Sequence, residues 1–297
     1  MHRLATFRII VLTLFLATVL CACAGLDYRP DPEAGPAYDV GEAFKKIQEE
    51  LVSASIVNIY VHRNGEYAPQ SVKVSVVSLD SYRLLLAGPM ANDGNVDGMW
   101  AWQLDWSRVN VDSGAVLHVR DYYWIRFGLS MNIGWKGDAG RQHAVDFFQA
   151  VRSLQLHAKS GALANYRKAI VDKHSAELEK YRAASSRPAL PAEALKYRVQ
   201  AESAIKHWRF VEALRPYQQA STIAPWWPEG YFNLALVWEE LGLYPEAVAY
   251  MKYYLLLAPD APNARAAQNK IFEWEGRSDG EKLPSGKPVF FPTRTHM

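Results

Sequence analysis

Three oxygen-bearing side chains stand at alternate positions in one short segment, which is the spacing of the first half of a calcium-binding loop. They are Asp93, Asn95 and Asp97, and Gly98 follows as the residue that permits a sharp turn. Such a loop should end in a bidentate Glu, but Leu104 occupies that place, with an aspartate one position later. The alternative is a hairpin loop rich in Asn, Asp and Gly. We keep these three residues as a calcium candidate and predict no other metal site.

No complete catalytic motif occurs in the sequence. Ser203 and Lys206 have the Ser-x-x-Lys spacing of penicillin-binding enzymes, in which a lysine can activate a serine. The Ser-Asp-Asn and Lys-Thr-Gly motifs that accompany it there do not occur. There is no His-Glu-x-x-His spacing, Gly-x-Ser-x-Gly elbow or P-loop either. We therefore predict a protein that is not an enzyme and needs no cofactor.

Cysteine usage and charge exclude several further classes. The only cysteines are Cys21 and Cys23, so neither a disulfide framework nor a Cys-rich zinc module is possible. The chain has 33 basic and 31 acidic residues, and two of the basic ones, Arg3 and Arg8, precede Cys23. The rest of the chain is therefore neutral, which argues against nucleic-acid binding and against membrane binding by bulk charge.

The N-terminus has a positively charged start and an apolar run that ends at Leu20, too short to cross a bilayer comfortably. With Ala22 and Cys23 it resembles the lipobox of bacterial lipoproteins, in which Leu stands three positions before the modified Cys. The resemblance implies a signal peptide over 1–22 and acyl chains on Cys23, and two or more chains anchor a protein stably. The residue after Cys23 is Ala24 and not Asp, which by the same resemblance implies sorting to the outer membrane. The alternative is an ordinary signal peptide without lipid.

The C-terminal part of the chain matches itself at a shift of 34 residues. The coinciding residues are Tyr197 with Tyr231, Ala201 with Ala235, Glu212-Ala213 with Glu246-Ala247, and Ala224-Pro225 with Ala258-Pro259. The pattern resembles the tetratricopeptide repeat, a helical hairpin whose small residues allow close helix approach. Leu234 and Trp238 share one helix face, and Gly242 suits the turn that follows. The resemblance implies two helical hairpins and a capping helix within 191–276.

In tetratricopeptide proteins, the first helix of each repeat lines a groove that receives an extended peptide or a partner helix. The resemblance places Arg198, Glu202, Lys206, Glu229, Phe232, Asn233, Leu236 and Glu239 in that groove. Asn233 matches a position that binds peptide backbone in such repeats, whereas the first copy has Val199 there, so a two-Asn clamp is absent. Phe232 is exposed in this interpretation; in the alternative it packs against the capping helix. The implied partner is a protein.

Residues 39–158 predict a small antiparallel β domain between helices. Helical spacing of apolar residues predicts helices over 39–54 and 139–157, and alternating runs predict strands at 56–63, 71–78, 82–87, 99–106, 116–119 and 122–128. Trp100, Trp102 and Trp106 lie on one face of their strand, which is typical of a core. The order of strands followed by a helix resembles a pleckstrin-homology-type barrel over 55–157. Such barrels bind peptides, proteins or lipid headgroups, so the resemblance selects no single function.

The predicted fold class is α+β, with an antiparallel β domain followed by an all-α repeat domain. The expected order is a signal peptide (1–22), the lipidated Cys23 with a flexible tether (23–38), the β domain (39–158), a connecting helix (159–190), the repeats with their capping helix (191–276) and an extended tail (277–297). The segment 160–184 is either part of the connecting helix or a degenerate third repeat closed by Pro191.

We expect a scaffold or adaptor, anchored by lipid in the bacterial outer membrane and facing the periplasm, that binds a protein through the groove. Two alternatives stay open. A carrier of lipid or another small ligand inside the β domain predicts an unfilled apolar cavity under Trp100 and Trp102. An enzyme with its site near the loop 89–99 predicts a pocket with converging titratable groups.

Overall fold

The computed structural model describes residues 25–54, 56–63, 66–72, 75–92, 95–109, 115–127, 131–184, 187–283, 285 and 289–292, so the predicted signal peptide and Cys23 lie outside it. The helices are α2 (Val40–Ser53), α3 (Gly140–Ser160), α4 (Ala162–Arg182), α5 (Ala192–Lys206), α6 (Phe210–Ile223), α7 (Pro228–Glu240), α8 (Tyr244–Leu257) and α9 (Ala264–Glu275). The strands are β1 (Gly25–Tyr28), β2 (Ile56–Arg63), β3 (Glu66–Val72), β4 (Ser75–Leu79), β5 (Arg83–Asn92), β6 (Asn95–Asp105), β7 (Val116–Val119), β8 (Tyr122–Phe127), β9 (Met131–Lys136) and β10 (Val289–Pro292). This composition confirms the α+β class.

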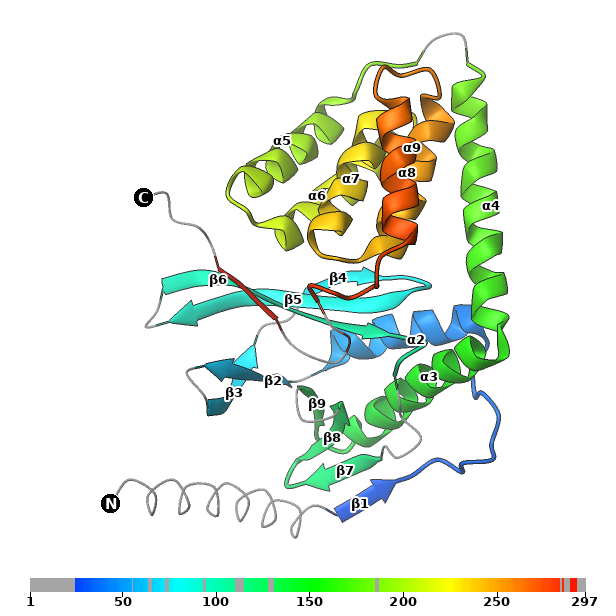
Figure 1. Cartoon of the computed structure of the whole chain (residues 1–297). Helices are drawn as coiled ribbons and strands as arrows, with labels where there is room; N and C mark the ends of the chain where they lie inside the picture. The colour runs from blue at the N-terminus through cyan, green and yellow to red at the C-terminus, as the bar shows by residue number, and fades with distance from the viewer. Residues whose placement is uncertain are drawn as a thin grey trace.

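The strands form two antiparallel sheets. The six-stranded sheet has the order β1-β7-β8-β9-β2-β3, and the four-stranded sheet has the order β10-β6-β5-β4. Helix α3 packs on β7, β8 and β9, and α2 packs on α3. Figure 1 shows the helices α5–α9 stacked above the four-stranded sheet, with α4 running along one side. The fold is therefore layered, with β5 and β6 between the helical part and the rest of the β-rich part.

Strand β9 leads into α3 and contains Gly134, a residue type with a weak preference for strands. Three residues of this strand, Met131, Ile133 and Trp135, alternate toward α3 and are buried. The indole nitrogen of Trp135 donates to the backbone oxygen of Glu50 at 3.0 Å, which joins β9 to α2. Packing of alternate side chains thus outweighs the turn preference of glycine at this place.

The described central part of the four-stranded sheet, at 84–87 and 100–104, is buried on both faces. Leu84 and Leu86 pack in the core of the β-rich part together with Trp100 and Trp102, whereas Leu85 belongs to the core of the helices. All five side chains are fully buried. A strand covered on both sides has a continuous apolar run rather than an alternating one, and residues 84–87 have such a run. The β-rich and helical parts therefore share one layer of structure.

The helical part repeats itself in space with the same 34-residue period as the sequence. Helices α6 and α8 are offset by that period. The hydrogen bonds of the turns before them recur as well. The Arg209 N–H donates to the Ala204 oxygen at 2.9 Å, and the Leu243 N–H donates to the Trp238 oxygen at 3.0 Å. The hairpins α5–α6 and α7–α8 are therefore two copies of one structural unit.

The turn inside each hairpin places one residue in the left-handed region of backbone conformation. Gly242 has a φ of 69°, and Trp208, which stands 34 positions earlier, has a φ of 60°. A side chain in this region is strained by roughly 1–2 kcal/mol, whereas glycine is not. The Trp208 ring is 48% exposed and contacts Phe210. The first copy thus keeps the geometry of the turn without the glycine that favours it.

The C-terminal segment crosses both parts, which corrects the predicted extended tail. We call its described residues, 276–283, 285 and 289–292, the strap. Leu283 is fully buried in the helical core, and the Gly280 N–H donates to the Gly242 oxygen at 2.9 Å. Strand β10 pairs antiparallel with β6. The open edge of β6 offers unpaired backbone groups, and Leu283 offers apolar surface, so the segment gains hydrogen bonds and burial by docking.

The predicted flexible tether is wrong over residues 25–38. Strand β1 pairs with β7, and the Arg152 guanidinium donates to the backbone oxygens of Asp31 and Pro32 at 3.0 and 3.1 Å. The backbone N–H groups of Ala37 and Tyr38 donate to the Ser153 hydroxyl at 3.0 and 3.2 Å. Polar side chains of α3 thus bind backbone N–H and C=O groups of a segment whose prolines and glycines are typical of a free linker.

Helix α4 is one continuous helix, so residues 160–184 do not form a third hairpin. It packs along α8 and also contacts α2 and α3. Near its start, the Arg167 guanidinium lies 3.8 Å from the centre of the Tyr82 ring and donates to the Ser81 oxygen at 2.6 Å. Further along, the His174 ring lies 4.7 Å from the ring of Tyr253 on α8. Helix α4 therefore braces the β-rich part against the back of the second hairpin.

Candidate functional site

Helix α5 buries three alanines against α6 and turns an apolar pair outward. Leu195 is 40% exposed and Val199 is 53% exposed, and the two stand four residues apart, so they share one side of the helix. We call this side the α5 face and define it by Leu195, Arg198, Val199, Glu202 and Lys206. Helix α5 forms one end of the helical stack, while α9 packs on α8 at the other end. The α5 face is thus an exposed apolar stripe with a charged border.

The three predicted groove residues of the first copy all lie on the α5 face. Arg198 Nε is 3.5 Å from Glu202 Oε1, and Glu202 and Lys206 are both exposed. The apolar pair between them was not part of the predicted groove. Its signal in the sequence is the spacing of Leu195 and Val199, which falls outside the alanine positions that face α6.

Tyr217 connects the α5 face to α7. This side chain is 1% exposed, and its hydroxyl forms a hydrogen bond with the side chain of Asn233. Burial, followed by the nearby Glu202 carboxylate, raises the pKa of Tyr217 to about 12. The structure therefore brings the predicted residues Arg198, Glu202 and Asn233 together around one buried phenol, which keeps its proton at neutral pH.

The remaining predicted groove residues lie on α7 and differ in their availability. Phe232 is half-buried, and its ring lies 5.0 Å from the Tyr254 ring of α8, edge to face, so it supports the second hairpin. Leu236 is half-buried and Glu229 is exposed. The Glu239 carboxylate accepts from Lys270 Nζ and from Trp274 Nε1, each at 2.9 Å. Glu239 thus holds the capping helix α9, which differs from its predicted place in the groove.

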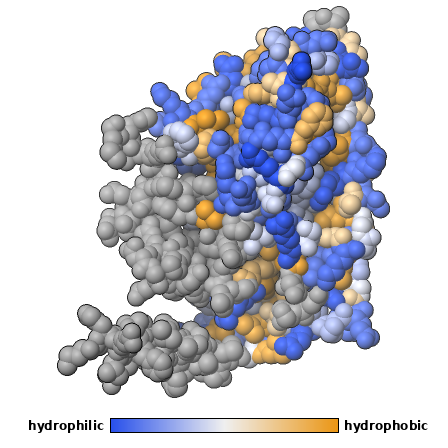
Figure 2. All heavy atoms as spheres, in the orientation of Figure 1, coloured by the Kyte–Doolittle hydropathy of each residue, from blue (hydrophilic) through white to orange (hydrophobic). Residues whose placement is uncertain are grey.

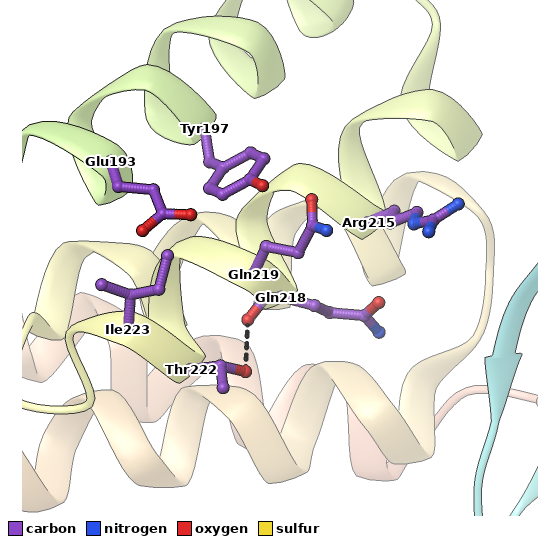
Figure 3. A pocket seen from close by; sticks show the side chains of 7 residues that line it. All are labelled: Glu193, Tyr197, Arg215, Gln218, Gln219, Thr222 and Ile223. Atoms are coloured by element: carbon purple, nitrogen blue, oxygen red, sulfur yellow. Dashed lines mark hydrogen bonds between the residues drawn. The ribbon is translucent and has the colours of Figure 1, made fainter.

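A pocket of about 320 Å³ opens between α5 and α6. Its lining residues are Glu193, Tyr197, Arg215, Gln218, Gln219, Thr222 and Ile223. Figure 3 shows Glu193 and Tyr197 of α5 beside Gln219 and Ile223 of α6. Glu193 and Glu202 are nine positions apart, which at about 100° per residue puts them on opposite sides of α5. The pocket therefore lies away from the α5 face, and sequence reasoning missed all its residues.

A buried charge cluster joins the β-rich part to the helices. Arg83 is 1% exposed, and its Nε and Nη2 donate to the two carboxylate oxygens of Glu246 at 2.5 and 2.8 Å. Arg83 Nη2 also donates to Asp279 at 3.0 Å, and Nη1 donates to Gln103 at 2.9 Å. Every guanidinium nitrogen thus has a partner within the protein. The cluster is therefore a structural bridge between β5, α8 and the strap.

Burial raises the pKa of Glu246 to about 7, against the opposing effect of the Arg83 charge and with a further upward contribution from Asp80. Burial acts to lower the pKa of Arg83, but the paired Glu246 carboxylate outweighs it and raises that pKa, so the guanidinium stays charged. A carboxylate that titrates near neutrality inside this bridge makes its strength depend on pH.

The calcium candidate lies only partly within the described residues and stays a prediction. Asn95 and Asp97 belong to β6, which runs as a strand paired with β5, while Asp93 lies outside the described residues. Asp105, at the far end of the strand, accepts from the Ser107 N–H at 2.8 Å and pairs with Arg108 at 3.5 Å. Ten residues of extended chain span about 33 Å, so Asp105 cannot complete a loop at Asn95. Within the described ranges, no three His, Cys, Asp or Glu side chains gather as metal ligands.

Comparison with known proteins finds no matching family model, no matching curated protein and no matching solved structure. For the part of the chain that the structure covers, no helix combines the length and apolar character needed to cross a membrane.

Proposed function

We propose that this chain is a lipid-anchored protein of the bacterial envelope that binds a partner protein through the α5 face and α7. The observation that supports it best is the exposed pair Leu195 and Val199 between the charges of Arg198, Glu202 and Lys206. An apolar strip with a polar border is the composition that receives a partner helix or an extended segment. On α7, Phe232 and Leu236 are half-buried and Glu229 is exposed, so this helix also offers apolar and charged groups.

The proposal includes that the two hairpins are tetratricopeptide repeats. Two pairs of equivalent small residues support it, because Ala201 and Ala235, like Ala213 and Ala247, are fully buried where the helices cross. The common 34-residue period and the shared turn geometry support it further. In such repeats α5 and α7 are the helices that face the bound chain, in agreement with the exposed apolar pair on α5.

For the β-rich part, the pleckstrin-homology-type barrel stays a prediction. The order of strands β2–β9 followed by α3 agrees with it, while β1 and β10 come from segments outside the predicted range. We propose that this part positions the repeats, since β5 shares its buried face with the helical core.

The lipid anchor can be tested separately from binding. Cells expressing the protein would be labelled with an alkyne analogue of palmitate, and the mature protein would be weighed by mass spectrometry. Cys23→Ser should remove both the label and the processed form, whereas the matched control Cys21→Ser should keep them. Labelling that survives Cys23→Ser would contradict the proposed anchor.

Binding can be tested with a photo-crosslinking amino acid placed at single positions. We expect a probe at Val199 to capture one envelope protein and a probe at Glu193, on the opposite side of α5, to capture none. The variant Leu195→Asp should abolish capture from Val199. Capture from Glu193 alone would place the working surface at the α5–α6 pocket instead.

A second candidate function is the binding of a small apolar ligand within the β-rich part. Trp100 and Trp102 are fully buried, and their indole nitrogens have no hydrogen-bond partner in the structure as described. A bound ligand with an acceptor group would satisfy them. Trp102 also lies 5.7 Å from the Phe127 ring, so side chains fill part of this core. Solvent extraction of purified protein followed by mass spectrometry should yield a ligand near one per chain, and an empty extract would count against this function.

A further inference from the structure

The six-stranded sheet has an inner face covered by α3 and an outer face whose residues follow from the strand register. Leu26 pairs with Leu117, and Leu117 pairs with Trp124. Residues that pair across antiparallel strands point to the same side. Val119 and Tyr122, two positions along, also pair and share that side. We define the outer face as Leu26, Leu117, Val119, Tyr122 and Trp124.

The outer face is apolar and aromatic, and it is open to solvent to different degrees. Leu26 is 56% exposed, and the other four residues are half-buried. The rings of Tyr122 and Trp124 lie 5.4 Å apart. Figure 2 shows hydrophobic residues at the lower edge of the molecule, where Figure 1 places β1, β7 and β8. Tyrosine and tryptophan are the residues that concentrate at the boundary between lipid and water.

Basic side chains accompany this aromatic surface. Arg126 is exposed and lies two positions from Trp124 on the same side of β8. Lys136, which pairs with Tyr122, is exposed and its ammonium lies 6.0 Å from the centre of the Tyr122 ring. The carboxylate of Asp27 on β1 is bound to Arg141 at 2.8 Å. Although the chain as a whole is neutral, this face carries exposed basic side chains, which attract anionic headgroups.

The N-terminal end of the chain determines where this face must lie if Cys23 carries lipid. One residue, Ala24, separates Cys23 from Gly25, the first residue of β1. Two residues of chain reach at most about 7 Å. Strand β8 is two strands away from β1, or about 10 Å across the sheet. The anchor thus holds β1 within about 7 Å of the lipid-bearing residue and β8 within about 17 Å of it.

We propose that the outer face of the six-stranded sheet rests on the surface of the bilayer that holds the lipid anchor. The inference relies on the proposed lipidation of Cys23. Tyr122 and Trp124 enter the headgroup region, and Arg126 and Lys136 contact anionic headgroups. The protein then lies directly on the membrane, in a set orientation, instead of moving on a long tether.

The test uses lipidated full-length protein, purified from the envelope and reconstituted in vesicles of phosphatidylethanolamine and phosphatidylglycerol. Cys21 is removed with the signal peptide and the Cys23 thiol is acylated, so an introduced cysteine is the only free thiol. Val119→Cys and His118→Cys are neighbours on β7 whose side chains point to opposite faces. His118 stacks on Tyr123 at 4.4 Å and is exposed. Each thiol carries an environment-sensitive fluorophore, and some vesicles contain spin-labelled lipid as a quencher.

We expect the fluorophore at position 119 to shift to shorter wavelength and to lose emission to the spin-labelled lipid, while the one at position 118 stays in water. Arg126→Cys gives a second outer-face probe, at an exposed site where folding is not at risk. Equal quenching at 118 and 119 would mean proximity without docking and would overturn the proposal. The proposal would also be overturned if neither the probe at 118 nor the probe at 119 were quenched. The mass of the protein reports acylation independently, and an unacylated Cys23 would overturn the anchor and this inference together.

Discussion

At the scale of residues, Arg83 and Glu246 determine how the β-rich part is joined to the helices. Arg83 donates to Glu246, Asp279 and Gln103 and is 1% exposed. Burying such a pair is costly in itself, but removing one partner leaves the other charge buried and unpaired. The sequence does not reveal this bridge, because Arg83 follows a Leu-Asp-Ser turn that is typical of an exposed hairpin and its partners are far away in the chain.

Arg83→Met should lower the free energy of unfolding by about 3 kcal/mol at pH 8, where Glu246 is ionised. Lys252→Met is the matched control, because Lys252 pairs with Glu275 at 3.0 Å on the surface. An exposed pair contributes at most about 1 kcal/mol, so this control should change stability little. Urea denaturation of both variants measures the difference, and similar losses in the two would contradict the bridge.

The pH dependence of stability should include a contribution from Glu246. Burial raises its pKa from 4.5 to about 7, so the folded state holds a proton that the unfolded chain releases between these values. Its stabilising contribution is full below pH 4.5 and is lost as the pH rises through about 7. Urea denaturation at several pH values should therefore show the wild type losing stability relative to Glu246→Gln between pH 5 and pH 8. A relative gain over that range would contradict the raised pKa.

Residue-level patterns predicted the core better than the chemistry. The alternation of Trp100, Trp102 and Trp106 predicted burial, and all three are fully buried. The alternation of Asn95 and Asp97 has the spacing of a calcium loop, and it is equally the spacing of residues in a strand such as β6, which contains both. A period of two in the sequence does not distinguish ligands around an ion from side chains on one side of a sheet.

At the scale of elements, the turn between α7 and α8 is where the strap meets the repeats. Gly242 has a φ of 69°, and a Cβ there would lie 2.9 Å from the backbone nitrogen of Lys282. Gly161, between α3 and α4, has a φ of 81° with nothing within 4 Å of such a Cβ. Alanine substitutions at the two glycines can therefore distinguish the cost of backbone strain alone from the added cost of contact with the strap.

Gly161→Ala should destabilise the protein by about 1 kcal/mol, from strain alone. Gly242→Ala should cost clearly more, since the strap must also move. Thermal unfolding of the two variants gives the comparison. If both alanines cost the same, the strap does not press against this turn.

Local elements were predictable where their signals are local. Helices α2, α3 and α5–α9 follow from apolar spacing and from the 34-residue repeat, and most strands follow from alternation. Strands β1, β9 and β10 were not predicted, and β3 and β4 were predicted as one strand over 71–78. Strands β1 and β10 each owe their structure to a partner far along the chain, β7 and β6 respectively. Segments rich in proline and glycine are typical of linkers, and only the tertiary contacts distinguish a docked one. The pocket between α5 and α6 was missed because it arises from the packing of two helices and not from a motif in either one.

At the scale of the whole molecule, the shared sheet should make the β-rich and helical parts unfold together. Leu85 and Ala87 on β5 lie in the helical core, while Leu84 and Leu86 lie in the other core. Urea transitions followed by near-ultraviolet circular dichroism, which reports tryptophan packing, and by far-ultraviolet circular dichroism, which reports helices, should coincide. Two separated midpoints would mean that the parts are independent domains.

The central claim is that the α5 face binds a protein, and an affinity measurement tests it most directly. Purified lipidated protein and the partner captured from Val199 would be titrated against each other, for the wild type and for Leu195→Asp/Val199→Asp. Two charges placed in an apolar contact should weaken binding by at least about a hundredfold, with unfolding unchanged because both side chains are exposed. The control Glu193→Ala/Thr222→Ala, in the pocket across α5, should bind as the wild type does. A folded α5-face variant that keeps its full affinity, beside a pocket variant that loses it, would contradict the claim.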